Sequence, residues 1–412
     1  MNYISLLYNN VTNMPEVNDD FTILWILISG ILVFFMQAGF TLLESGMTQS
    51  KNAVNIAMKN FMDISVATIT FWVIGYGLMY GAKTAGFISL GSDVFFNPGA
   101  GAHDVFFQLV FAATAATIVS GAIAGRTKYS VFAIFAVIIT GLIYPIAGGW
   151  EWNPDGWLNS ASFMPVQFID LAGSSIVHAV GGWAALVGAY MVGPRIGKYV
   201  KGKVEAIPGH NKTLATLGVM VLWFGWFGFN GGSQLALAGF ENATAVATIY
   251  INTNLAACAG VMTCAVITRL VNGKTDVIMM LNGALGGLVA ITAEPLTPTP
   301  LMAIIIGAIG GIIVILGTQA LNKLQIDDVV GAIPVHLFAG IWGTLAVPLT
   351  NSGTSFGPQL LGTASICAFV FVVSFIVWSI MKATIGIRIS EEAEKEGTDI
   401  AETGVTAYAI RD

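Results

Sequence analysis

Apolar residues gather in eleven stretches of the chain, and short polar segments separate these stretches. Each stretch is long enough to cross about 30 Å of hydrocarbon as a helix that rises about 1.5 Å per residue. We therefore predict an all-α polytopic membrane protein with eleven transmembrane helices. The predicted spans are residues 22–44, 60–81, 104–125, 129–150, 171–193, 213–232, 245–268, 276–293, 301–320, 329–349 and 357–384.

The positively charged residues indicate an orientation. When alternate loops are assigned to opposite sides of the membrane, all of the 17 lysines and arginines except Lys83 fall on one side. Lysine and arginine are enriched in cytoplasmic loops. The asymmetry predicts an N-terminus outside, a cytoplasmic C-terminus and a location in the cell (plasma or inner) membrane.

A short motif occurs in both halves of the chain. Asp170 precedes His178 by eight residues, Asp328 precedes His336 by eight, and a glycine follows each histidine by four. The two copies lie in the fifth and tenth predicted spans. Five spans followed by five more must be inverted, because five is odd. Inverted repeats place binding sites near the middle of the membrane, where the repeats meet.

These observations predict a five-plus-five inverted repeat followed by a long eleventh helix. The expected divisions are an extracellular N-terminal segment (1–21), a first half of five spans (22–193), a cytoplasmic loop (194–212), a second half of five spans (213–349), the eleventh span (357–384) and a cytoplasmic C-terminal tail (385–412).

The composition agrees with a lipid environment. Hydrophobic residues make up 55% of the chain and charged residues 10%, whereas soluble domains contain about 25% charged residues. The few cations form no basic stripe, so we do not expect a nucleic-acid partner. The three cysteines lie in apolar runs without metal-site spacing, and we expect neither a metal nor a cofactor.

Two of the four histidines lie well inside apolar spans. Ionisable residues within a membrane usually face a cavity or each other. In a neutral imidazole pair, one ring nitrogen donates a hydrogen bond while the other accepts. We expect His178 and His336 to form such a pair in mid-pore. The alternative is that both histidines bind helix backbones as packing contacts.

Aromatic residues suggest a site for a small cation. Phe107 and Phe111 are four residues apart and share a helix face, as do Phe229 and Ser233. An aromatic cage with a hydroxyl acceptor attracts a small cation through cation–π and hydrogen-bonding interactions.

Three tryptophans, Trp150, Trp152 and Trp157, lie at the outer end of the fourth span. Tryptophans at this level most often anchor a helix at the membrane interface. Composition alone does not separate Trp152 from the other two.

Several motifs, in this order and spacing, resemble the ammonium transporter (Amt/Rh) family over nearly the whole chain. They are Gln37-Ala38-Gly39-Phe40, Leu43-Glu44, Phe107-Gln108, Phe111-Ala112, Tyr144-Pro145 with Trp152, Asp170-Leu171-Ala172-Gly173-Ser174 with His178, Gly225-Trp226-Phe227-Gly228-Phe229-Asn230, Asp327-Asp328, Val335-His336, Gly340-Ile341-Trp342-Gly343, Gly386-Ile387-Arg388 and Glu396-Gly397.

The resemblance implies a homotrimer with one pore in each subunit. It also implies an outer substrate-binding site for ammonium, formed by Trp152, Phe111 and Ser233. Asp170 would support the electrostatics of this site without touching the substrate.

The resemblance further implies an aromatic gate below that site. Phe107 or Phe111, together with Phe229, would close the pore entrance. His178 and His336 would be the paired pore histidines beneath the gate.

Three departures from the family pattern indicate a divergent Amt-type member. Gly149 stands where many relatives have histidine, Gly331 where many have aspartate, and Thr403 where the tail commonly has histidine. These departures concern cytoplasmic regulation more than permeation, because the pore residues are intact.

The expected function is electrogenic ammonium transport, in which ammonium is deprotonated outside and neutral ammonia crosses a hydrophobic pore. Desolvation is the reason, since a bare cation in hydrocarbon costs far more than neutral ammonia. The alternative is an ammonium-sensing receptor domain of a larger signalling protein. An enzyme has less support, because no nucleophile–base pair or metal cluster accompanies the pore histidines. A pore for another gas would not need an aromatic cage.

The acidic tail after Arg388 suggests a strap on the cytoplasmic face. Its carboxylates could lie against the basic loop that contains Lys198, Lys201 and Lys203. Exposed pairs contribute only about 0–1 kcal/mol each, so a strap also needs packing. The resemblance names a PII-type signal protein as a candidate partner at this face. The alternative is a solvated, partly disordered tail.

Overall fold

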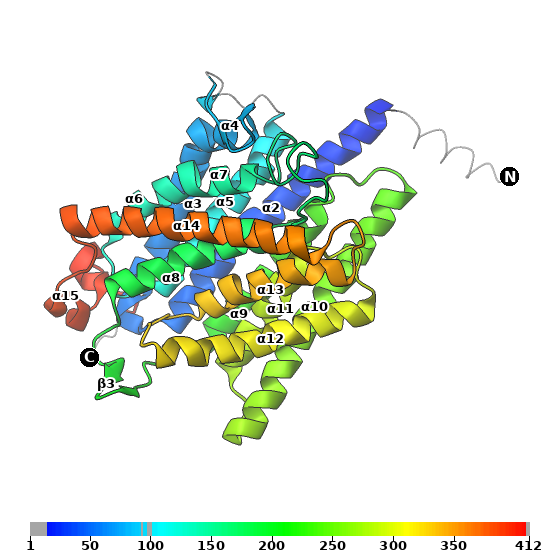
Figure 1. Ribbon diagram of the computed structural model, residues 1–412. Coiled ribbons are helices and arrows are strands. Elements are labelled where there is room, and N and C mark those ends of the chain that lie inside the picture. Colours follow the sequence, from blue (N-terminus) through cyan, green and yellow to red (C-terminus); the bar gives the residue numbers. More distant parts are fainter. Residues whose placement is uncertain (1–14, 92–93, 97–100, 409–412) are drawn as a thin grey trace.

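The computed structural model describes residues 15–91, 94–96 and 101–408. Within these residues, nine helices are long and apolar enough to cross a membrane, and two shorter apolar segments, Val277–Thr292 and Ile333–Leu349, accompany them. The helices pack into a single bundle (Figure 1), and the predicted fold class is confirmed. Residues 1–14 of the predicted N-terminal segment and residues 409–412 of the tail lie outside the described residues.

The first half contains helices that π-helical turns interrupt in several places. Its elements are α2 (Pro15–Met47), α3 (Ala53–Thr70), a π-helical turn (Phe71–Gly75), α4 (Tyr76–Tyr80), β1 (Lys83–Thr84), β2 (Ile88–Ser89), α5 (Ala102–Ala122), α6 (Tyr129–Ile138), a second π-helical turn (Ile139–Ile143), α7 (Tyr144–Gly149), a third (Ser174–Ala179) and α8 (Val180–Val192).

The second half follows a short hairpin of β3 (Tyr199–Val200) and β4 (Lys203–Val204). Its elements are α9 (Lys212–Gly232), α10 (Phe240–Asn272), α11 (Val277–Thr292), α12 (Pro300–Lys323), a π-helical turn (Ile333–Phe338), α13 (Ala339–Ala346), α14 (Phe356–Thr384), α15 (Glu391–Glu396) and a last π-helical turn (Asp399–Thr403).

The helix that forms the second span begins earlier than the sequence predicts. It begins with a 3₁₀ turn at Ser50 and continues into α3, whereas the predicted span begins at residue 60. The polar side chains of Asn55, Lys59 and Asn60 in this stretch are buried within the bundle. They bond to the tail, to the α5–α6 loop and to α2, respectively, so hydropathy alone does not detect this part of the helix.

Close packing of α2 against α9 depends on small residues. A Cβ atom at Gly46 would lie 2.5 Å from the carbonyl oxygen of Asn211 and 2.6 Å from the backbone nitrogen of Ala215. Gly218 on α9 approaches the backbone of Gly39 and Leu43 in the same manner. Small residues at such crossings allow membrane helices to approach closely. The crossing holds α2 next to the centre of the bundle.

The tail returns to the bundle at the end where the β3–β4 hairpin lies. In Figure 1, α15 and β3 occupy the same end of the molecule, and α14 runs along α8 toward it. The segment that follows α14 pairs with the α5–α6 loop through a bridge between Thr127 and Arg388. The segment that follows α14 is therefore part of the packed fold.

Candidate functional site

A cavity of about 270 Å³ opens beside the C-terminal ends of α4 and α9 and the N-terminal end of α5. We call it the aromatic vestibule, and among its lining residues are Phe107, Phe111, Trp152 and Ser233. The structure thus brings together the side chains that the sequence suggested for a cation site. Trp150 does not line it, because its ring packs 5.0 Å from Phe369 and its indole N–H donates to the carbonyl oxygen of Phe87.

Hydrogen bonds fix the polar groups of this vestibule. The indole N–H of Trp152 donates to the carbonyl oxygen of Asp170 at 2.9 Å, which holds the ring across the cavity. The Trp152 ring meets Phe111 edge to face at 6.0 Å. The hydroxyl of Ser233 donates to the carbonyl oxygen of Phe229 at 2.8 Å, so its oxygen lone pairs can still accept a bond from a ligand.

Five polar residues that line the vestibule were not predicted as site residues from the sequence. They are Tyr80, Asp104, Gln108, Glu151 and Asn159. Gln108 is only 7% exposed, and its Oε1 has no hydrogen-bond partner among the described residues. Their spacing along the chain follows no motif, because a loop and two helices bring them together. The Asp104 carboxylate makes the vestibule favourable for a cation, whereas burial raises the pKa of Glu151 well above its ordinary value.

Stacked phenylalanines close the floor of the aromatic vestibule. The rings of Phe111 and Phe229 stack with centroids 4.1 Å apart, and Phe107 lies 4.7 Å from Phe111. All three side chains are nearly fully buried. Phe229 in turn stacks on the ring of His178 at 5.3 Å. The aromatic contacts therefore lead from the vestibule directly to the histidines.

The two buried histidines lie side by side beneath the phenylalanines. Their Nδ1 atoms are 3.2 Å apart, and their rings are tilted by 25° with centroids 5.2 Å apart. His178 is 0% exposed and His336 3% exposed. One Nδ1 must donate and the other accept, so the pair shares a proton. The ring of Trp226 covers His178 on another side at 5.1 Å.

The repeated aspartates explain why both histidines reach this point. Asp170 accepts hydrogen bonds from the backbone N–H groups of residues 173–176, at 2.7–3.2 Å. Asp328 accepts from those of residues 331–333, at 2.7–3.1 Å. Each carboxylate caps the π-helical turn that carries its histidine. The motif is thus a cap with a histidine about two turns later, once in each repeat.

A narrower passage continues on the other side of His336. A small cavity of about 10 Å³, enough for about one water molecule, is lined by Phe40, Glu44, Val330 and His336 among others. It shares Asn282, Val330 and Gly331 with a wider cavity of about 130 Å³, which we call the tail-side vestibule.

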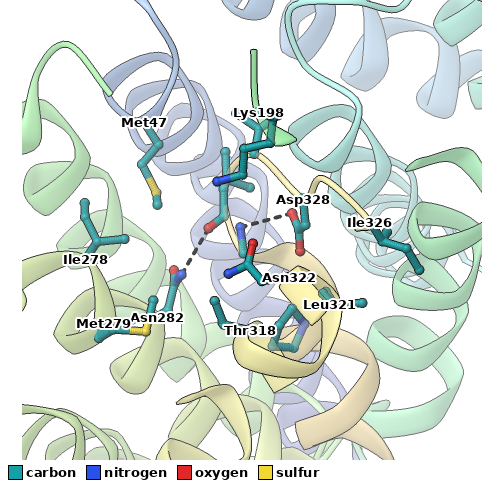
Figure 2. A pocket seen from close by; sticks show the side chains of 14 residues that line it. Met47, Lys198, Ile278, Met279, Asn282, Thr318, Leu321, Asn322, Ile326 and Asp328 are labelled. Atoms are coloured by element: carbon teal, nitrogen blue, oxygen red, sulfur yellow. Dashed lines mark hydrogen bonds between the residues drawn. The ribbon is translucent and has the colours of Figure 1, made fainter. Parts of the chain in front are cut away.

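Figure 2 shows the tail-side vestibule, with Lys198, Asn322 and Asp328 around it. The Asn282 amide donates to the carbonyl oxygen of Val330 at 3.1 Å. Gly331 has a φ of +79°, and a side chain there would collide with the Asn282 amide. A larger residue at position 331 therefore does not fit without movement of Asn282. This contact explains why glycine, rather than the aspartate of many relatives, suits position 331 in this chain.

Buried ion pairs support the loops at the tail side. Arg195 binds Asp327 in a bidentate pair, with Nε to Oδ2 at 2.7 Å and Nη2 to Oδ1 at 2.9 Å. Burial alone would raise the pKa of Asp327, but the bonds from Arg195 and the charge of nearby Arg126 hold it below its ordinary value. Burial lowers the pKa of Arg126 to about 10. Its guanidinium donates only to backbone carbonyls.

The acidic tail docks, but on partners other than those that the sequence suggested. Asp399 accepts from the backbone N–H groups of Val54 and Asn55 at 3.1 and 2.8 Å. Glu402 accepts from the Asn55 amide at 2.9 Å and from the backbone N–H of Tyr129 at 2.8 Å.

The expected contacts with the basic loop are largely wrong. Lys201 and Lys203 are exposed, and Glu394 binds Arg388 and the backbone N–H of Ile196 instead, at 2.7 Å each. The tail carboxylates bind backbone N–H groups at a helix start rather than surface lysines. A buried N–H group without an acceptor is costly, whereas an exposed lysine is satisfied by water.

The departure at Gly149 also has a local explanation. The ammonium group of Lys83 occupies the place where a side chain at position 149 would lie. It donates to the carbonyl oxygen of Leu78 at 2.7 Å, and burial lowers the pKa of Lys83 to about 8. Lys83, the exception to the one-sided charge pattern, therefore fills the space beside Gly149.

Taken together, a membrane-spanning bundle with two vestibules, and with stacked phenylalanines and a hydrogen-bonded histidine pair between them, defines a membrane transport protein. A family model described as Ammonium Transporter Family matches residues 24–408. The chain belongs to the ammonium transporter family.

Individual relatives agree with this membership. The chain is 44% identical to ammonium transporter Amt2 of Archaeoglobus fulgidus, over 96% of this chain and 89% of the relative. It is 41% identical to a putative ammonium transporter of Synechocystis, over 97% of this chain and 92% of the relative.

Solved structures share the fold. A structure named Sensor Amt Protein superimposes with a TM-score of 0.89 at 36% identity, over 95% of this chain and 100% of that chain. Candida albicans Mep2 superimposes with a TM-score of 0.82 at 26% identity, over 94% and 93% of the two chains.

Proposed function

We propose that the protein transports ammonium: it recruits the cation in the aromatic vestibule, deprotonates it there and conducts ammonia through the pore. One observation carries the proposal. Trp152, the stacked pair of Phe111 and Phe229, and the two histidines form a continuous series of ring contacts from the vestibule to the middle of the bundle.

The aromatic vestibule suits ammonium for two reasons. The ring of Trp152 offers a cation–π contact, and the Ser233 oxygen offers an acceptor. The carboxylate of Asp104 lines the same space and favours a positive charge. Ammonium satisfies an acceptor with an N–H bond, whereas a bare potassium ion of similar size has no hydrogen to donate. These features support selection of ammonium against potassium.

Deprotonation before entry follows from the closed floor. Phe111 and Phe229 leave no polar partner for a cation, and a charge stripped of water in an apolar channel is very costly. Neutral ammonia costs much less. A side-chain rotation of the phenylalanines opens the way for a molecule of this size.

The proton can follow by a separate route through the histidine pair. When one imidazole accepts a proton on one side, its neighbour can release a proton on the other side. The 3.2 Å contact between the Nδ1 atoms supports this relay. Transport is then electrogenic, because one positive charge moves for each ammonium.

Electrophysiology on solid-supported membranes tests the proposal directly. Proteoliposomes with the purified protein should give transient currents with ammonium and methylammonium and none with potassium. An equal current with potassium would refute the selectivity, and absence of any current with ammonium would refute electrogenic transport. A protein that binds ammonium without ammonium-dependent flux would instead favour the ammonium-sensing receptor, a function that the name of one related structure carries.

We also propose a homotrimer with one pore per subunit, with the N-terminus outside and the tail in the cytoplasm of the cell membrane. Mass measurement in mild detergent tests the trimer, and an active monomer would refute it. Protease cleavage of the tail in inside-out but not in right-side-out vesicles tests the orientation. A PII-type signal protein is the proposed partner of the tail-side face, and co-purification tests it.

A further inference from the structure

A carboxylate lines the passage on the tail side of the pore histidines. Glu44 on α2 is 2% exposed and lines the small cavity that also contains His336. Phe40, one helical turn earlier on the same face of α2, lies 6.4 Å from the His336 ring. Glu44 is therefore placed about one turn beyond the histidine toward the tail-side vestibule.

The two oxygens of this carboxylate have different surroundings. Oε2 accepts hydrogen bonds from the Asn60 amide at 2.9 Å and the Ser120 hydroxyl at 2.6 Å. The Asn60 side chain is itself held by the Thr117 hydroxyl, at 2.7 Å. These bonds fix the position of the carboxylate between α2, α3 and α5.

Oε1 of Glu44 has no hydrogen-bond partner among the described residues. A methyl group built on Gly121 would lie 3.1 Å from this oxygen. Glu44 itself lines the small cavity, which has room for about one water molecule. Because both donors are bonded to Oε2, Oε1 is the oxygen left to accept a proton from a water in the passage.

Other ionisable groups near Glu44 come from α3. Lys59 is fully buried and donates to the carbonyl oxygen of Thr127 at 2.9 Å. Asp63 is fully buried, and neither of its oxygens has a partner among the described residues. Neither group lines the passage that contains His336. Glu44 is the carboxylate that lines the small cavity itself.

We propose that Glu44 accepts the proton that leaves the histidine pair and passes it to the tail-side vestibule. Protonated His336 gives its proton to a water in the small cavity, and that water gives a proton to Glu44 Oε1. The imidazole returns to its neutral form and the carboxylate becomes a carboxylic acid. Release of the proton to water in the tail-side vestibule restores the carboxylate, so one proton enters and one leaves.

This inference rests on the proposed electrogenic transport, and its test separates the two. Glu44→Gln keeps an oxygen for the Asn60 and Ser120 donors but removes the proton acceptor. Glu241→Gln, at an exposed position in the first turn of α10, is the control for the loss of one carboxylate. Two quantities are measured on the same proteoliposomes: the ammonium-induced current, and ammonia entry followed as uptake of radiolabelled methylammonium, which counts the substrate whether or not its proton follows.

We expect Glu44→Gln to lower the current at least about tenfold, as loss of a positioned proton acceptor typically does, while ammonia entry stays close to that of the wild type. Glu44→Asp should recover part of the current, and Glu241→Gln should retain all of it. The wild-type current should slow in deuterated buffer, and the residual Glu44→Gln current should not.

An unchanged current in Glu44→Gln would overturn the inference and leave the proposed function intact. Equal loss of current and ammonia entry would also overturn it, because Glu44 would then only hold the helices. A wild-type protein without current would instead refute the proposed function. If Glu44→Gln does not fold, Ser120→Ala releases Oε2 while the carboxylate remains. A several-fold lower current with normal ammonia entry is expected there, and a wild-type current would overturn the inference.

Discussion

Replacement of Trp152 by leucine tests the assignment of the aromatic vestibule most directly. The indole ring forms one wall of the vestibule, and its N–H is held by the carbonyl oxygen of Asp170. Leucine removes the π face and the N–H but remains apolar. A cation–π contact contributes about 0.5–2 kcal/mol, which corresponds to a change of roughly two- to thirtyfold in affinity.

The measurement is the ammonium concentration that gives a half-maximal current on a solid-supported membrane, together with inhibition by potassium. We expect the half-maximal concentration to rise within that range and discrimination against potassium to fall. Trp152→Phe retains a π face and loses only the N–H bond, so it should show a smaller change. The difference between the two variants measures the contribution of the ring.

Trp150→Leu is the matched control. Trp150 lies two residues away, but its ring packs on Trp157 and Phe369 and does not line the aromatic vestibule. We expect reduced thermal stability with unchanged ammonium affinity. If Trp152→Leu transports with wild-type affinity, or if Trp150→Leu shows the same loss, the cation site is not where we place it.

Three further predictions concern the supports of the pore. In Asp170→Asn, the amide N–H group faces backbone N–H donors that the carboxylate accepts in the wild type. The free energy of unfolding in detergent should fall by about 1–3 kcal/mol. An unchanged melting temperature would argue against the cap. Burial lowers the pKa of Lys83 from 10.5 to about 8, so the unfolded chain binds more protons between these values, and stability should rise with pH in this window. Lys83→Met should remove this rise of the melting temperature with pH. If the rise persists in the variant, another group causes it. Deletion of residues 390–412 should lower transport and expose the start of α3 to hydrogen exchange without loss of the folded bundle; full transport after the deletion would show that the docked tail does not matter for activity.

The sequence predicts the bundle well because lipid imposes simple requirements. Long apolar stretches follow from the cost of polar groups in hydrocarbon. The paired histidines were also predictable, because ionisable residues are rare in such stretches and these two recur at the same distance from an aspartate. The structure adds the reason for that distance, namely the capped π-helical turns.

Features that depend on three-dimensional contacts could not be predicted. The predicted second span begins at residue 60 and misses the start of α3, because hydropathy does not reveal the buried hydrogen bonds of its polar side chains. These bonds join Asn55 to Glu402, Lys59 to the carbonyl oxygen of Thr127, and Asn60 to Glu44. The partners of the tail were mistaken for a similar reason. Opposite charges in the sequence suggested pairs between the tail carboxylates and surface lysines. Asp399 and Glu402 instead accept hydrogen bonds from backbone N–H groups, which a sequence pattern of charges does not reveal.

The docked tail has a consequence for biosynthesis. The N–H groups of Val54 and Asn55 find their acceptor only in Asp399, which follows Val54 by 345 residues. A growing chain places the first spans in the membrane long before this acceptor is made. Until Asp399 is made, water must satisfy those N–H groups, so the start of α3 stays at the aqueous surface. Asp399 therefore completes one of the earliest helices, and a chain interrupted before it carries a helix start whose two N–H groups have no carboxylate acceptor.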